Sequence, residues 1–242
     1  MRIGVAQTKP VKGDIPANIE AHLRCIVLAS TVQAEALFFP ELSLTGYELA
    51  LANALATDQD DARLDALQRT SDELGIIIGA GLPTRAGADV RISMVILEPH
   101  RPRRTYSKQH LHVDEYPYIQ PGVGQVMIDT ATTRIAPAIC FESQLPAHAA
   151  KAFNLGADVY LASVSKSERG VAKAHDHYAT ISKQYGRPVL MCNSAGPSDT
   201  FVSGGRSAAW TRDGILAGQL AADEEGILVY DTVTGEVTRR IV

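Results

Sequence analysis

Three residues with reactive side chains follow short apolar runs of the kind that form buried strands. Glu41 follows residues 36–39, Lys108 follows a strand-like segment, and Cys140 ends the run 135–139. In sheets covered by helices, strand ends open into crevices where ligands bind. A carboxylate, an ammonium and a thiol at such a crevice are the groups needed for covalent catalysis with a thiol nucleophile.

The context of Cys140 is the most informative of the three. It closes an apolar strand and is followed by the turn Phe141-Glu142-Ser143 before a predicted helix. This strand–turn–helix order resembles a nucleophile elbow, which presents the reactive side chain outward and leaves backbone N–H groups free as oxyanion donors. We therefore treat Cys140 as a candidate nucleophile.

Each of these residues alone has an ordinary interpretation. A cysteine at a strand end is most often a small buried apolar residue, a glutamate after aromatic residues is usually a loop carboxylate, and a lysine among basic residues is usually solvated. Cys25 and Cys192 lie in apolar segments and are predicted to be core residues. The combination of the three candidates in one sequence context favours the functional interpretation.

The histidines do not predict a metal site. His175 and His177 are two residues apart, so on a helix they point to different faces. His110 and His112 would share one face of a strand, but no carboxylate or cysteine at ligand spacing completes a site. We expect no metal and no organic cofactor.

Short apolar strands alternate with longer amphipathic stretches along most of the chain, which predicts an α/β fold. Helices are expected over residues 17–33, 61–74, 145–155 and 170–185, the last three closed by Gly75, Gly156 and Gly186. Strands are expected over residues 2–7, 36–39, 76–80, 90–97, 124–130, 133–139, 157–163 and 188–192, with a hairpin-like tail at 205–211, 215–219 and 226–231. We expect one domain over residues 1–242.

Length and charge exclude several classes of protein. The chain has 242 residues, 45% of them hydrophobic and 21% charged, and a formal net charge of −4. A near-neutral chain with a pI of about 6.0 has no electrostatic footprint for nucleic acid. The longest apolar run, near residues 76–82, is far shorter than a membrane-spanning helix requires.

The three cysteines are far apart, odd in number and without a CxxC pair, which argues against a disulfide framework or a zinc knuckle. The first residues do not have the pattern of a signal peptide. We expect a cytoplasmic protein without membrane or nucleic-acid partners.

The motifs around the three candidates resemble the nitrilase, or carbon–nitrogen hydrolase, superfamily over nearly the whole chain. Residues 39–47 (FPELSLTGY) are similar to its glutamate motif, and residues 106–111 (YSKQHL) with Glu115 and Pro121-Gly122 are similar to its lysine motif. Residues 139–142 (ICFE) with Pro146 resemble its cysteine motif. The same resemblance includes the opening residues 3–7 with Asn18, and also Asn193, Gly196 and residues 205–207.

The resemblance implies a catalytic triad of Glu41, Lys108 and Cys140, with Glu115 as an auxiliary member. Glu41 would take the thiol proton, pass it to the departing amine and then activate water. The Lys108 ammonium and the backbone N–H of Phe141 would stabilise the tetrahedral oxyanion. Tyr47, Phe141 and Glu142 are the further residues expected at the oxyanion or substrate.

The resemblance also implies a four-layer α-β-β-α sandwich, usually joined into a homodimer. We expect a hydrolase that cleaves a small, linear, non-peptide amide through a cysteine thioester. Many amidase branches have an arginine shortly after the cysteine motif that can pair with a substrate carboxylate, and residues 140–146 contain none. This absence disfavours a carboxylate-bearing amide unless another basic residue substitutes.

Three alternatives remain. The Cys-aromatic-Glu run approaches the motif of true nitrilases, although those generally have a longer C-terminal extension. Acyl transfer to a second nucleophile would use the same triad, but we expect neither the membrane helices of the lipoprotein acyltransferases nor the ATP-using domain of the NAD-synthesis members. A catalytically silent member that keeps the fold for ligand binding is the alternative from a different functional class.

Overall fold

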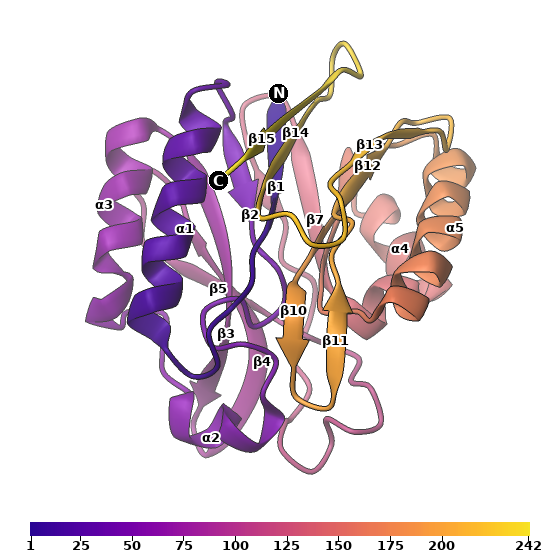
Figure 1. Cartoon of the computed structure of the whole chain (residues 1–242). Coiled ribbons are helices and arrows are strands. Elements are labelled where there is room, and N and C mark those ends of the chain that lie inside the picture. The colour runs from indigo at the N-terminus through magenta and orange to yellow at the C-terminus, as the bar shows by residue number, and fades with distance from the viewer.

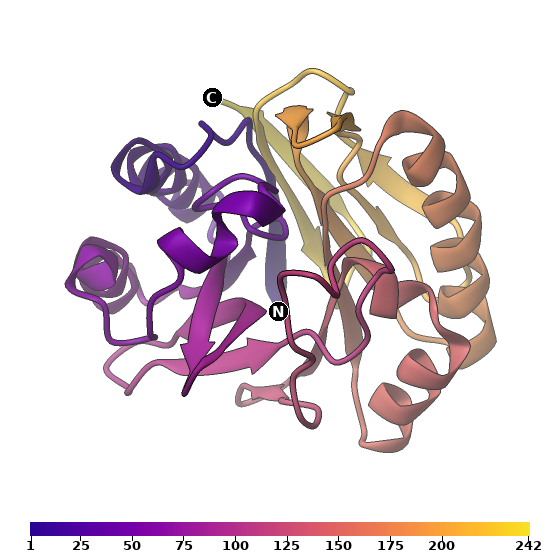
Figure 2. The same cartoon turned by 90° about the horizontal axis from the view of Figure 1, so that it is seen from below.

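Two β-sheets stack face to face, and helices cover the outer face of each (Figure 1). The computed structural model describes all residues, Met1–Val242. Seen from below, the two groups of helices lie on opposite sides of the paired sheets (Figure 2). The four-layer α-β-β-α sandwich expected from the sequence is therefore confirmed.

The first sheet has seven strands and a parallel centre made by β1, β2 and β3. Its strands are, in spatial order, β15 (Val237–Ile241), β14 (Gly226–Asp231), β1 (Arg2–Gln7), β2 (Ala36–Phe38), β3 (Ile77–Ala86), β4 (Asp89–Leu97) and β5 (Arg104–Ser107). The remaining neighbours pair antiparallel.

The second sheet has six strands and a parallel centre made by β7, β8 and β9. Its strands are, in spatial order, β13 (Leu216–Gln219), β12 (Ala208–Trp210), β9 (Val189–Asn193), β8 (Val159–Val164), β7 (Arg134–Ile139) and β6 (Ile128–Asp129). A separate hairpin is formed by β10 (Ala195–Ser198) and β11 (Phe201–Gly204).

Helices connect the parallel strands, as crossovers between parallel neighbours require. They are α1 (Ile15–Ser30), α2 (Ala52–Leu55), α3 (Asp65–Leu74), α4 (Pro146–Asn154) and α5 (Glu168–Tyr185), with 3₁₀ turns at Leu49–Leu51, Ala62–Leu64 and Cys140–Gln144. In Figure 1, α1 and α3 lie on the first sheet and α4 and α5 on the second. No helix is long and apolar enough to cross a membrane.

Three apolar clusters fill the spaces between the layers. The largest lies between the sheets and includes Ile3, Tyr106 and Leu161, all fully buried. A second cluster packs α1 and α3 onto the first sheet, and a third packs α4 and α5 onto the second. Cys25 and Cys192 are buried in this core, as predicted.

The helix ends follow local chemistry. Asp14 caps α1 by accepting a hydrogen bond from the backbone N–H of Ala17 at 3.0 Å, so the helix begins two residues earlier than the expected residue 17. Gly75 and Gly186 adopt left-handed conformations just past α3 and α5, as predicted for C-terminal caps. α1 ends at Ser30, before the expected residue 33, because Gln33 has a positive φ of 57°.

The expected strand over residues 124–130 is wrong for most of its length. Only Ile128–Asp129 pairs, as β6, because Gly124 has a positive φ of 76° that breaks an extended strand. Gln125 bonds to β7 through its side chain instead: its Nε2 donates to the carbonyl oxygen of Pro137 at 2.8 Å. The β10–β11 hairpin and β15 were not expected as strands.

The parallel strands place the predicted residues at one end of the molecule. β2 leads into Glu41 and β7 leads into Cys140, while antiparallel β5 leads into Lys108. A hydrogen bond between the sheets holds the strand ends before Glu41 and Cys140 near each other. Ser163 Oγ on β8, the neighbour of β7, donates to the carbonyl oxygen of Phe39 at 2.7 Å. Both sheets thus contribute to a single site.

The turn that carries Glu41 lies directly against Gly81 of β3. A Cβ atom at Gly81 would lie 2.4 Å from the carbonyl oxygen of Pro40 and 2.6 Å from the nitrogen of Leu42. Leu44 N donates to the carbonyl oxygen of Gly81 at 2.9 Å, which holds the turn in place. Only glycine allows this close approach of two backbones.

We expect Gly81→Ala to displace the Glu41 turn and to cost about 1–3 kcal/mol of unfolding free energy, the usual range for overpacking. Gly218→Ala is the matched control, since its Cβ would crowd only the side chain of Val237, at 2.9 Å. Urea unfolding measures the loss of stability, and the rate of Cys140 alkylation by iodoacetamide measures the displacement at the site. Equal alkylation rates in both variants would contradict the proposed link between Gly81 and the site.

Candidate active site

Cys140 lies at the sharp turn between β7 and the following 3₁₀ turn. Its φ of 49° is in the left-handed region, which a non-glycine residue adopts only when its surroundings impose it. Ser143 Oγ stabilises the turn by donating to the carbonyl oxygen of Cys140 at 2.5 Å. The sulfur is thereby directed away from the strand, as the nucleophile-elbow pattern predicts.

A buried cluster of three charges lies beside this turn. Lys108 Nζ donates to Glu41 Oε1 at 2.7 Å and to Glu115 Oε1 at 2.5 Å. None of the three side chains is exposed to solvent. The structure therefore brings the predicted Glu41, Lys108 and Glu115 together, as an ammonium between two carboxylates.

Tyr47 and the backbone of His112 complete the environment of Glu115. The Tyr47 hydroxyl donates to Glu115 Oε1 at 2.9 Å, and His112 N donates to Glu115 Oε2 at 2.8 Å. Both oxygens of Glu115 are thus occupied. Glu41 differs, because its Oε2 is buried and has no hydrogen-bond partner in the Lys108 cluster or elsewhere.

Glu41 has the capacity to accept a proton near neutral pH. Burial raises the pKa of Glu41 to about 7; the charge of Lys108 and its hydrogen bond oppose the rise, and the charge of Glu115 adds to it. Glu41 therefore combines a pKa near neutrality with a free buried oxygen. These are the properties of a general base.

Cys140 needs such a base. Burial, followed by the charge of Glu41, raises the pKa of the Cys140 thiol to about 11, and the nearby charges of Lys166 and Lys108 only partly offset this. The thiol is therefore protonated at neutral pH. Burial alone would lower the pKa of Lys108, but Glu41, Cys140 and Glu115 raise it above its ordinary value, so Lys108 stays an ammonium.

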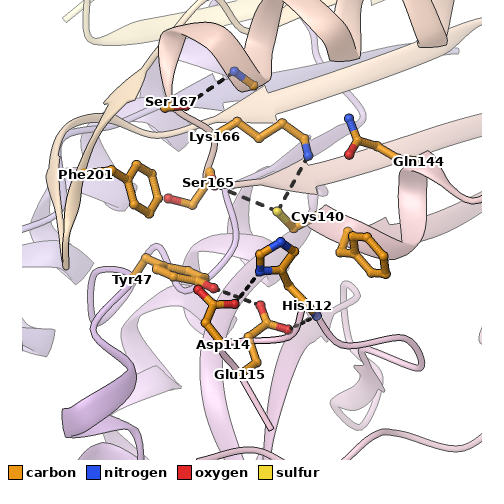
Figure 3. A pocket seen from close by; sticks show the side chains of 12 residues that line it. Tyr47, His112, Asp114, Glu115, Cys140, Gln144, Ser165, Lys166, Ser167 and Phe201 are labelled. Carbon is orange, nitrogen blue, oxygen red and sulfur yellow. Dashed lines mark hydrogen bonds and ion pairs between the residues drawn. The ribbon is translucent and has the colours of Figure 1, made fainter.

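A pocket of about 270 Å³ opens over Cys140 (Figure 3). Of the predicted residues, Tyr47, Glu115, Cys140 and Phe141 line it, while Glu41 and Lys108 are fully buried and do not line it. The other lining residues are His112, Asp114, Gln144, Ser165, Lys166, Ser167, Gly170 and Phe201.

Glu142 does not line the pocket, in contrast to the expectation that it contacts substrate. It is fully buried, and both of its oxygens accept hydrogen bonds from the protein. Oε1 accepts from Ile139 N at 2.7 Å and from the Tyr106 hydroxyl at 2.5 Å, and Oε2 accepts from Gln109 N at 2.6 Å. Glu142 therefore ties the strand end before Cys140 to the loop after Lys108.

Sequence reasoning assigned no role to Lys166. Lys166 Nζ lies 3.8 Å from Cys140 Sγ, and the carbonyl oxygen of Ser165 lies at the same distance from that sulfur. A signal was present, because Ser165 and Lys166 directly follow an expected strand, as Glu41, Lys108 and Cys140 do. Phe201 was also left without a role, and it packs edge-on against Tyr47 with ring centroids 5.7 Å apart.

Two asparagines that carry part of the family resemblance hold these loops. Asn18 on α1 bonds to the backbone of Val11 and donates to the carbonyl oxygen of Leu44 at 3.0 Å. Asn193 accepts from Lys166 N at 2.8 Å and donates to the carbonyl oxygens of Lys166 and Gly205. Both residues position backbone segments that carry site residues.

The histidines are engaged in other contacts. His175 and His177 each place Nε2 3.2 Å from a backbone carbonyl oxygen, those of Arg206 and Ser143 respectively. His112 pairs with Asp114 through Nδ1 at the pocket entrance. No group of three or more histidine, cysteine, aspartate or glutamate side chains is arranged to hold a metal ion.

We expect Glu142→Gln to destabilise the protein and slow alkylation of Cys140. All groups facing the Glu142 oxygens are donors, so the glutamine NH₂ would face a backbone N–H and leave it unpaired, at a cost of about 1–3 kcal/mol. Glu73→Gln, at an exposed position of α3, is the control. Unchanged stability together with unchanged alkylation would contradict the positioning role of Glu142.

Comparison with known proteins identifies the family of this chain. The carbon–nitrogen hydrolase family model matches residues 2–240. A glutamine-dependent NAD(+) synthetase from Xanthomonas campestris pv. campestris is 27% identical over 98% of this chain and 44% of its own length. A 2-oxoglutaramate amidase from Bacillus subtilis is 25% identical over 83% of this chain and 85% of its own length. The chain thus spans less than half the length of the NAD(+) synthetase.

Solved structures share the fold. The NitN amidase from Nesterenkonia sp. AN1 superposes with a TM-score of 0.87 at 22% identity, covering 96% of this chain and 92% of its own. A variant of that amidase, with a TM-score of 0.87 at 21% identity over 95% of this chain and 89% of its own, shows the acetamide moiety of fluoroacetamide added covalently at the active-site cysteine. The match of the family model over almost all of the sequence establishes that this chain belongs to the carbon–nitrogen hydrolase family.

Proposed function

We propose that this protein hydrolyses a small, linear, non-peptide amide to an acid and ammonia or an amine through a thioester on Cys140. The observation that carries the proposal is the convergence of four groups from separate segments at one pocket. Cys140 and Glu115 line the pocket, and Lys108 joins Glu115 to Glu41 through two buried hydrogen bonds. Placing three buried charges together is costly unless each is paired, so the cluster is unusual for a purely structural role.

Acylation uses Glu41 as base and then as acid. The thiol proton passes to Glu41 as Sγ attacks the amide carbonyl carbon, and the C=O electrons move to oxygen. The Lys108 ammonium and the Phe141 N–H stabilise that oxyanion, where loss of one donor typically costs about 3–4 kcal/mol. The oxyanion then collapses, the C–N bond breaks, and protonated Glu41 returns its proton to the leaving nitrogen.

Deacylation repeats these steps with water. Glu41 removes a proton from water as its oxygen attacks the thioester carbonyl, and the C–S bond breaks after the second tetrahedral intermediate. The proton held by Glu41 returns to the sulfur and restores the thiol. Glu115 keeps Lys108 charged and oriented throughout, because it accepts one of the ammonium hydrogen bonds at 2.5 Å.

The relatives support an amide rather than a nitrile. One curated relative is a 2-oxoglutaramate amidase, and the structural neighbours described above are amidases. A pocket of about 270 Å³ lies just below the usual range of ligand pockets, about 300–1,000 Å³, which fits a small substrate. Nitrile hydrolysis and acyl transfer use the same groups and are separated by the second experiment below.

We expect kcat/KM to fall as the pH drops below about 7. Glu41 has a raised pKa of about 7, so below that pH it is protonated and cannot accept the thiol proton. A pH profile from about pH 5 to about pH 9 reports this ionisation of the free enzyme. Activity that stays constant down to about pH 5, as an ordinary glutamate pKa of about 4.3 would give, would contradict the assignment of Glu41 as the base.

We also expect a brief exposure to amides to leave an acyl adduct on the wild-type protein but not on Cys140→Ala. Intact-protein mass spectrometry with butyramide, butyronitrile and ethyl butyrate would give the acyl mass, and peptide mapping would place it on Cys140. Glu41→Gln should acylate far more slowly, and Cys140→Ala should lose roughly a millionfold in turnover, as other nucleophile variants do.

The same experiment separates the alternatives. Turnover of the nitrile without the amide would assign a nitrile hydrolase. Acylation by the amide without release of acid, unless an amine is added, would assign an acyltransferase. No adduct on folded wild-type protein with any of the three compounds or with an amide that carries a carboxylate, and no turnover of them, would favour a ligand-binding member of the family.

A further inference from the structure

Lys166 is a buried cation without a counter-ion. Its side chain lines the pocket, yet the residue is only 8% exposed. Lys166 forms no ion pair, and the one hydrogen-bond partner of its ammonium is Cys140 Sγ at 3.8 Å. A buried ammonium is costly in free energy unless it is paired with an anion. A pocket that contains an unpaired ammonium therefore favours binding of an anionic group.

The backbone of Lys166 is fixed on both sides. Asn193 Oδ1 accepts from Lys166 N at 2.8 Å, and the Lys166 carbonyl oxygen accepts from Gly204 N at 2.8 Å. Gly170 leaves room for the aliphatic stem, since a Cβ there would lie 3.3 Å from Lys166 Cβ. The ammonium is therefore directed toward the pocket by a rigid support, which lowers the entropic cost of binding.

The N-terminus of α5 opens on the same wall. Ser167 caps this 18-residue helix, and both Ser167 and Gly170 line the pocket. The first turn of a helix carries a partial positive charge that favours anions. The acidic residue in this turn, Glu168, is 77% exposed and pairs with Arg206, so it does not neutralise Lys166.

The carboxylates of the pocket lie on the opposite wall. In Figure 3, Lys166 and Ser167 lie on one side of Cys140, and Asp114 and Glu115 lie on the other. Glu115 is paired with Lys108, and Asp114 is paired with His112 at the entrance. The sulfur thus lies between the unpaired cation of Lys166 and carboxylates that already have partners, so an anion in the pocket has Lys166 as its free charged partner.

We propose that Lys166 and the N-terminal turn of α5 bind a carboxylate of the substrate, so that the preferred amides are short monoamides of dicarboxylic acids. The proposal rests on amide hydrolysis at Cys140 and specifies its substrate class. Lys166 supplies the basic group that the sequence lacks after Glu142, and it comes from a different strand end. The small pocket limits the spacer between the carboxylate and the amide to a few carbons.

The kinetic test compares matched amides. Succinamate and butyramide have nearly the same shape, but only succinamate carries a carboxylate in place of the terminal methyl group. We expect the wild-type enzyme to have a higher kcat/KM for succinamate than for butyramide. Lys166→Met should reduce this ratio by about tenfold or more, which corresponds to the loss of one hydrogen bond to a charged group. The change should appear mainly in KM. Lys166→Arg should retain most of the preference, and Lys173→Met, at an exposed position of α5, is the control.

A second measurement does not depend on turnover. Iodoacetate and iodoacetamide both alkylate a thiol with loss of iodide, but only iodoacetate is an anion. We expect Lys166→Met to slow modification of Cys140 by iodoacetate more than by iodoacetamide, as followed by peptide mapping. Cys25 and Cys192 are buried, so their alkylation in the same peptide map shows whether a variant has become generally more accessible to the reagents.

These results distinguish the proposal from its alternatives. Lys166→Met could slow alkylation by both reagents equally and lower kcat/KM for both amides equally. In that case Lys166 only activates the thiol, and the proposal is wrong. A wild-type preference for butyramide would also overturn it. If no amide is hydrolysed, the proposed function fails, and the ratio of the two alkylation rates alone decides whether Lys166 recognises anions.

Discussion

The ion pair between Lys108 and its two carboxylates is the interaction on which the site depends. An ammonium and two carboxylates without solvent exposure are tolerable only while they remain hydrogen-bonded to one another. The two carboxylates differ in their remaining hydrogen bonds. Glu115 has further donors from Tyr47 and His112 N, whereas Glu41 keeps one oxygen unpaired. Burial raises the pKa of Glu41 to about 7, so Glu41 combines a free oxygen with the pKa that proton transfer requires.

The stacking of two sheets explains how such a cluster is assembled. Glu41 and Lys108 follow strands of the first sheet, and Cys140 and Lys166 follow strands of the second. Hydrogen bonds between the sheets and loops then fix the relative positions: Ser163 Oγ donates to the carbonyl oxygen of Phe39, and Glu142 joins the segments around Ile139 and Gln109. The catalytic geometry is thus maintained by buried polar contacts whose loss would leave unpaired groups.

The sequence predicted the parts of this molecule in which pattern and chemistry agree. The strands leading to Glu41, Lys108 and Cys140, and the left-handed caps Gly75 and Gly186, follow from apolar runs and glycine positions. Exposed β15 and the β10–β11 hairpin lack an apolar face that marks a strand. Glu142 was assigned to substrate because position in a motif does not reveal which way a side chain points, and here it points into a network of backbone donors.

Lys166 shows why substrate choice is harder to read than reaction type. Acyl transfer places fixed demands on a base, a nucleophile and an oxyanion donor, so those residues occur in recognisable motifs. A charge that recognises a substrate has only to reach the pocket, and any strand end around it can supply that charge. Here the cation follows β8 rather than the cysteine turn, and its environment becomes informative only in three dimensions. The absence of a counter-ion at its ammonium, rather than its position in the sequence, is what distinguishes Lys166 from Lys108, which is paired with Glu41.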